Sequence, residues 1–137
     1  MTDYDDIGKR MMRLAVGELF VDSGPSVGIQ FGHGAGTARI DGVVADLVAV
    51  EIESRVPKQI RGAMLDLVLH ACPRKLLVLM PGYIGNPEII VNQSNTILGR
   101  FLEPNTFRVV LITDDLEASI SKVRTALADL GVELQTT

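Results

Sequence analysis

The strongest constraint on the fold lies in residues 39–61, where two β-like runs are followed directly by a helical pattern. Within residues 47–55, Glu51 and Glu53 alternate with the apolar Val50 and Ile52, which is the period of a strand with one apolar face. On such a strand Glu51, Glu53 and Arg55 share one face. The stretch therefore predicts a β-hairpin whose second strand carries acids, followed by a helix.

The same hairpin would bring an acid of its first strand close to the acids of its second. Residues 37–44 form the earlier β-like run, and folding back through a short turn would place Asp41 beside Glu51 and Glu53. Three converging carboxylates repel one another unless a cation lies among them, and hard oxygen ligands suit Mg²⁺ or Mn²⁺. We therefore expect a hydrated divalent cation. In the alternative, the acids form a solvated strand face and pair with cross-strand Arg side chains, without a metal.

Composition limits the class of protein. A chain of 137 residues with 47% hydrophobic content predicts one domain, residues 1–137, with a buried core. The single cysteine, Cys72, excludes an internal disulfide framework and a Cys-rich zinc site. It fits a reducing compartment, so we expect a cytoplasmic protein. Because no signal-peptide pattern and no apolar run of about 18 residues occur, we expect no membrane span.

Charge is unevenly distributed along the chain. The formal net charge of −4 argues against nonspecific coating of nucleic acid, which depends on Lys and Arg. Between residues 55 and 75 the only acid is Asp66, and the basic residues there are Arg55, Lys58, Arg61, Arg74 and Lys75. This stretch directly follows the acidic hairpin, so it could contact phosphate. The alternative is a solvated helix face.

The remaining elements alternate between helices and strands. The pattern predicts helices at residues 5–20, 57–71, 87–102 and 116–130, and strands at residues 26–31, 75–80 and 107–113 besides the hairpin. In the opening helix, Ile7, Met11, Leu14 and Ala15 have the spacing of a buried stripe. This order predicts one α/β domain with a central mixed sheet flanked by helices, beginning with a three-stranded meander.

Two further residues are weaker candidates for a site. Glu18 continues the apolar stripe of the opening helix, so it either reaches solvent or supplies a fourth carboxylate. His33 lies in a glycine-rich loop that lacks the Gly-Lys-Ser/Thr ending of a P-loop. It would contact phosphate or serve as an acid, or it has no role.

In this order of elements and acids the chain resembles the PD-(D/E)XK nuclease superfamily, which has the restriction-endonuclease-like fold and includes archaeal Holliday junction resolvases. The resemblance extends from the opening helix to the strand at residues 75–80. Ile40 and Asp41 match the PD half of the motif, and Glu51, Ile52 and Glu53 match the other half. Two positions depart from the pattern, because Ile40 stands in place of Pro and Glu53 in place of Lys.

The resemblance implies metal-dependent hydrolysis of phosphodiester bonds in DNA. Asp41, Glu51 and the backbone carbonyl of Ile52 would hold the Mg²⁺ or Mn²⁺ ion. Glu53 would take the place of the Lys that helps to activate the nucleophilic water. The accessory helix positions of the family would be matched by Glu18, as a further metal ligand, and by Gln59 or Lys58. The phosphate contacts would come from Arg55, Lys58, Arg61 and His33.

Two questions about partners and activity follow. A nuclease of this size has little surface for a duplex, so we expect a homodimer or a partner subunit. Because Glu53 replaces the usual Lys, a second hypothesis stays open. The chain would then be an inactive nuclease-like domain that serves as a binding or assembly module of a DNA-processing complex.

Overall fold

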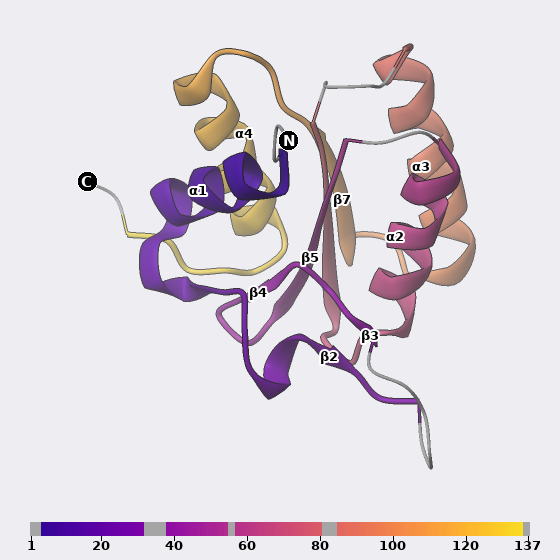
Figure 1. Ribbon diagram of the computed structural model, residues 1–137, viewed down its shortest axis with the longest axis horizontal. Helices are drawn as coiled ribbons and strands as arrows, with labels where there is room; N and C mark the ends of the chain where they lie inside the picture. Colours follow the sequence, from indigo (N-terminus) through magenta and orange to yellow (C-terminus); the bar gives the residue numbers. More distant parts are fainter. Residues whose placement is uncertain (1–3, 32–37, 55–56, 81–84, 136–137) are drawn as a thin grey trace.

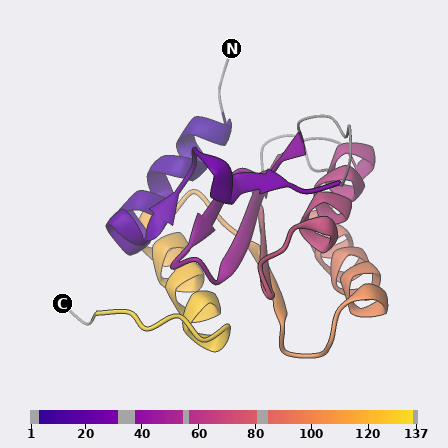
Figure 2. The same ribbon diagram turned by 90° about the horizontal axis from the view of Figure 1, so that it is seen from below.

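A five-stranded mixed sheet lies between two layers of helices in the computed structural model (Figure 1). The structure describes residues 4–31, 38–54, 57–80 and 85–135. Helices α1 (Tyr4–Val16) and α4 (Leu116–Asp129) cover one face of the sheet, and α2 (Pro57–Leu69) and α3 (Pro87–Phe101) cover the other. Figure 2 shows the same layers from below. The chain is therefore an α/β fold.

The main sheet has the strand order β1-β4-β5-β6-β7. Its strands are β1 (Phe20–Val21), β4 (Gly42–Val44), β5 (Val48–Glu53), β6 (Arg74–Leu79) and β7 (Phe107–Leu111). The first three are antiparallel neighbours, whereas β5, β6 and β7 run parallel. Parallel neighbours need a crossover, and α2 and α3 supply it on the same face of the sheet. The mixed sheet expected from the sequence is confirmed.

β5 is buried on both faces, although its sequence alternates like a half-exposed strand. All six of its residues are buried, because α1 lies over one face and α2 over the other. Val50 and Ile52 pack in the core beside α1, and Ala49 packs in the core beside α2. Glu51 and Glu53 alternate with Val50 and Ile52, so they lie on the α2 face. The alternative of a solvated acidic strand face is therefore contradicted for Glu51 and Glu53.

The amino-terminal third departs from the sequence expectation. α1 ends at Val16 instead of continuing to residue 20, because Gly17 takes the left-handed conformation (φ +59°) that ends helices. The 3₁₀-helix η1 (Gly17–Leu19) then leads into β1. Residues 26–31, which were expected to form the first strand of the main sheet, are not part of that sheet. After the 3₁₀-helix η2 (Pro25–Val27), β2 (Gly28–Ile29) pairs with β3 (Ala38–Arg39) in a separate small sheet.

The buried stripe of α1 matches the expected one at Met11 and Ala15 only. Ile7 and Leu14 are exposed, and the buried positions are Gly8, Met11, Met12 and Ala15. A Cβ on Gly8 would lie 2.5 Å from Cγ2 of Ile52. Gly8 therefore faces the sheet, and the absence of a side chain there lets α1 approach β5 closely.

The carboxy-terminal half follows the expectation closely. The expected helices and strands of this half all form, with ends that differ by one to two residues. The side chain of Asp115 caps the start of α4, because it accepts the N–H of Ala118. Within the described residues, no helix is both long and apolar enough to cross a membrane.

Candidate functional site

The candidate site lies where β4 and β5 part. Their ladder pairs Gly42 with Val50, and one residue further the two strands separate. The N–H of Ile40 donates to the carbonyl of Val27 (2.9 Å), so the chain before Asp41 turns toward the small sheet. Asp41 is therefore the last point at which the two strands meet.

Carboxylates replace the backbone ladder at this point. The N–H of Asp41 donates to Glu51 Oε1 (2.8 Å), and the N–H of Ile52 donates to Asp41 Oδ2 (2.7 Å). Both distances are in the range of well-formed N–H···O hydrogen bonds. The two side chains are thereby held beside each other, as the sequence predicted for Asp41 and Glu51.

Glu51 has an unusual protonation equilibrium because only 7% of it is exposed. Burial, above all, raises its pKa to about 9, and the negative charge of Asp41 adds to the effect. The charge of Asp66 and a side-chain hydrogen bond with Asp41 raise the pKa further, whereas the hydrogen bond from the Asp41 N–H lowers it. At neutral pH Glu51 is therefore protonated beside an acidic neighbour. Such a pair favours either a shared proton or a bound cation.

Asp66 of α2 belongs to the surroundings of the pair, and the sequence analysis missed it as a site residue. Its charge acts on Glu51, and its own pKa is raised by burial. Gln59 lies seven residues earlier, so it is on the same side of α2. The sequence does single out Asp66, because it is the only acid between residues 55 and 75 and it is next to Leu67, which is fully buried.

Glu53 lies two residues beyond Glu51 on the same face of β5 and is 4% exposed. Its Oε1 accepts the N–H of Ser54 (3.1 Å), and its backbone carbonyl accepts the N–H of Met80. The carbonyl of Ile52 points the other way, toward Asp41, because the N–H and C=O of one strand residue point to the same side. The backbone oxygen expected to bind metal thus faces the pair.

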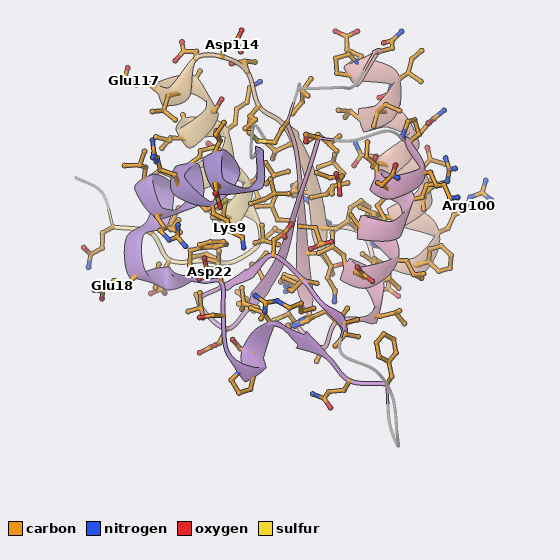
Figure 3. All side chains as sticks on the ribbon, viewed as in Figure 1. Lys9, Glu18, Asp22, Arg100, Asp114 and Glu117 are labelled. Carbon is orange, nitrogen blue, oxygen red and sulfur yellow. The ribbon has the colours of Figure 1, made fainter. Side chains whose placement is uncertain are left out.

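Glu18 does not lie near the pair. It belongs to η1, its side chain is exposed, and Figure 3 shows it directed away from the sheet. The next strand pairs Phe20 with Val44, at the end of β4 opposite to Asp41. Of its two readings, the one in which Glu18 reaches solvent describes the structure.

The four residues expected to contact phosphate differ in where the structure places them. Lys58 and Arg61 are exposed at the start of α2. Arg61 points toward α3, where it lines a cavity with Ile97, and it lies about 140° around the helix from Asp66. It therefore does not face the carboxylates. Arg55 and His33 lie outside the described residues.

The donors at the pair fit a hard cation. Asp41, Glu51 and the Ile52 carbonyl offer oxygen only, and Mg²⁺ commonly uses one or two carboxylates and completes its shell with water. A cation would also take the place of the Glu51 proton. Across the described part of the chain, no three His, Cys, Asp or Glu side chains are grouped as metal ligands. No protein-family model, no curated protein and no solved structure matches the chain.

Proposed function

We propose that this protein is a divalent-metal-dependent nuclease of restriction-endonuclease-like fold that hydrolyses phosphodiester bonds in DNA. The observation that carries the proposal is the Asp41–Glu51 pair, in which Asp41 is half-buried and the buried Glu51 has a pKa of about 9. Two acids held side by side in a poorly solvated place are costly for a fold, and a metal site is a function that requires them.

The order of elements supports the same proposal. A helix, three antiparallel strands, a helix and a strand parallel to the third follow one another as α1, β1, β4, β5, α2 and β6. This is the arrangement that the resemblance implies, with the small β2–β3 sheet as an insertion before the hairpin. The two halves of the motif come together at the point where β4 and β5 part.

Each residue of the site would have a distinct role. Asp41, Glu51 and the Ile52 carbonyl would hold the metal ion. The ion, when bound, would lower the pKa of a coordinated water and neutralise charge on the scissile phosphate. Asp41 is oriented by the N–H of Ile52, and Glu51 would release its proton on loading. Glu53 would orient or deprotonate the attacking water, and Lys58 would contact the DNA backbone.

One observation favours a second candidate, an inactive nuclease-fold module that binds or assembles with other components. Asp41 and Glu51 accept main-chain N–H groups of the hairpin, so the pair has a structural use even without a metal. In that case the protein would keep its fold and its acids but bind no divalent cation.

Calorimetric titration with Mn²⁺ and Mg²⁺ distinguishes the two candidates. Wild type should bind and release about one proton per ion near pH 7, seen as a dependence of the heat on the buffer. Asp41→Asn and Glu51→Gln should abolish binding, and with it metal-dependent nicking of supercoiled plasmid or branched DNA. Asp46→Asn is the matched control for Asp41→Asn, because it makes the same substitution in an exposed turn of the same hairpin.

The outcomes separate cleanly. Binding and nicking that are lost together in both site variants, and kept in Asp46→Asn, support the nuclease. A wild-type protein that binds neither ion contradicts the nuclease and favours the inactive module. Ion binding without nicking of either DNA argues against catalysis on DNA.

A further inference from the structure

A solvent-open groove lies between α2 and α3, which run side by side on one face of the sheet (Figures 1 and 2). It contains a cavity of about 180 Å³ lined by Arg61, Met64, Leu65, Val68, Ile97 and Phe101. Leu65 is 58% exposed and Phe101 is 68% exposed. A smaller cavity of about 20 Å³ continues the groove to Pro57 and Gln93. From Pro57 to Val68 the groove therefore follows α2 for about 16 Å, or three helical turns.

The size of the groove limits what it can hold. Pockets for cofactors and drug-sized ligands measure about 300–1,000 Å³, so a cavity of 180 Å³ suits a single bulky side chain. Its walls are apolar apart from Arg61, which argues against nucleic acid, because nucleic acid needs polar and cationic donors along the phosphates. Exposed bulky apolar side chains around a small pocket are typical of a protein-binding surface.

The rim of the groove is positively charged on both sides. Arg61 lies on α2, and Arg100 lies on α3 one turn after Ile97 and two turns after Gln93, so it is on the groove side of that helix. Figure 3 shows Arg100 projecting from α3 into solvent. Among the described residues that line the groove, none is acidic. A complementary partner therefore carries negative charge next to an apolar surface.

The charges also argue against a second copy of this chain as the occupant. A two-fold contact places the same surface patch on both subunits. Such a contact would bring Arg61 and Arg100 of both copies into one interface with no acid among the described lining residues, and like charges in an interface are repulsive.

We propose that the α2–α3 groove is a docking site for an acidic amphipathic helix of a partner protein. One bulky apolar side chain of that helix fills the cavity, and neighbouring Asp or Glu side chains pair with Arg61 and Arg100. Helices in grooves bind through anchors at such i, i+3, i+4 and i+7 positions. Arg61 and Asp66 are on different sides of α2, so this site is separate from the carboxylate pair.

Selection from a displayed library of helix-forming 16-residue peptides, randomised on one face, tests the proposal with purified wild-type protein. Enriched peptides should carry one bulky apolar residue with Asp or Glu about one turn away. Phe101→Ala and Arg61→Glu should each weaken their binding by about tenfold or more, which corresponds to about 1.4 kcal/mol. Arg10→Glu is the matched control, since it reverses an exposed charge on α1, across the sheet, and should bind like wild type.

Both groove substitutions are at exposed positions, so circular dichroism and melting should match wild type. Amide shifts in an NMR titration with an enriched peptide should concentrate on α2 and α3. The proposal is overturned if no peptide is enriched, if the enriched peptides lack acids, or if Arg61→Glu binds as tightly as Arg10→Glu. It is also overturned if wild type sediments as a dimer that Phe101→Ala dissociates, because the occupant would then be a second copy.

Discussion

Asp41 and Glu51 are joined through each other's main chain, because the N–H of Asp41 donates to Glu51 Oε1 and the N–H after Glu51 donates to Asp41 Oδ2. The pair thus bridges β4 and β5 at the open end of the hairpin, and burial together with the charge of Asp41 raises the pKa of Glu51 to about 9. Stability and metal binding require different protonation states of Glu51. A proton on Glu51 removes the charge repulsion with Asp41 and stabilises the fold, whereas a bound cation would take the place of that proton.

The first prediction concerns pH. The pKa of Glu51 rises from 4.5 to about 9 on folding, so between these values the folded state keeps a proton that the unfolded chain has lost. The stabilisation that this retained proton gives the folded state is fully present below about pH 4.5 and is lost as pH rises toward 9. The free energy of unfolding should therefore fall by at most about 1.4 kcal/mol per pH unit. Glu51→Gln should remove this slope. Urea unfolding of both proteins from pH 5 to 9 measures it, and parallel curves would contradict the assignment.

The second prediction separates the two uses of Asp41. Asp41→Ala leaves the buried N–H of Ile52 without its acceptor, which should cost about 1–3 kcal/mol of unfolding free energy. Asp41→Asn keeps an oxygen at that place and should cost less. Chemical denaturation at pH 7 compares them. Equal losses in the two variants would show that charge matters more than the hydrogen bond.

The third prediction uses two helical glycines. Gly8→Ala places a methyl group 2.5 Å from Cγ2 of Ile52, a stiff β-branched side chain, and should destabilise the fold by about 1–3 kcal/mol. Gly62→Ala on α2 meets no atom within 4 Å and should stabilise the fold by up to about 1 kcal/mol. Thermal melts of both variants check the contrast. A stabilising Gly8→Ala would mean that α1 does not depend on this close approach.

The fourth prediction compares two buried serines, each 1% exposed. Within the described residues, Ser94 Oγ has no hydrogen-bond partner, whereas Ser119 Oγ accepts the N–H of Thr113 and donates to its carbonyl. Ser94→Ala should therefore stabilise the protein by about 1 kcal/mol, and Ser119→Ala should destabilise it by about 1–3 kcal/mol. Equilibrium unfolding decides, and a loss of stability in Ser94→Ala would reveal a partner of that hydroxyl.

The sequence predicts an element correctly where its residue pattern is compatible with only one kind of secondary structure. The apolar run of β6 and the capped helix α4 formed as expected, because a buried strand and a helix start have local signatures. The prediction failed for α1 and the first strand. Gly8 has no side chain and so gives no signal in a hydrophobic pattern, although this absence lets its side of α1 approach the sheet.

The alternation of helices and strands from residue 57 onward, the hairpin and the neighbouring positions of Asp41 and Glu51 were predicted from the sequence alone, because side-chain period and turn chemistry act over a few residues. The tertiary structure decided how those acids behave. Because α2 covers β5, Glu51 is buried and its pKa is raised. The same packing brings the charge of Asp66, which lies on α2, close enough to Glu51 to raise that pKa further. The tertiary structure also directed Glu18 into solvent and Arg61 toward α3. Burial and through-space charge depend on which elements pack together, and a single chain's local pattern does not contain that information.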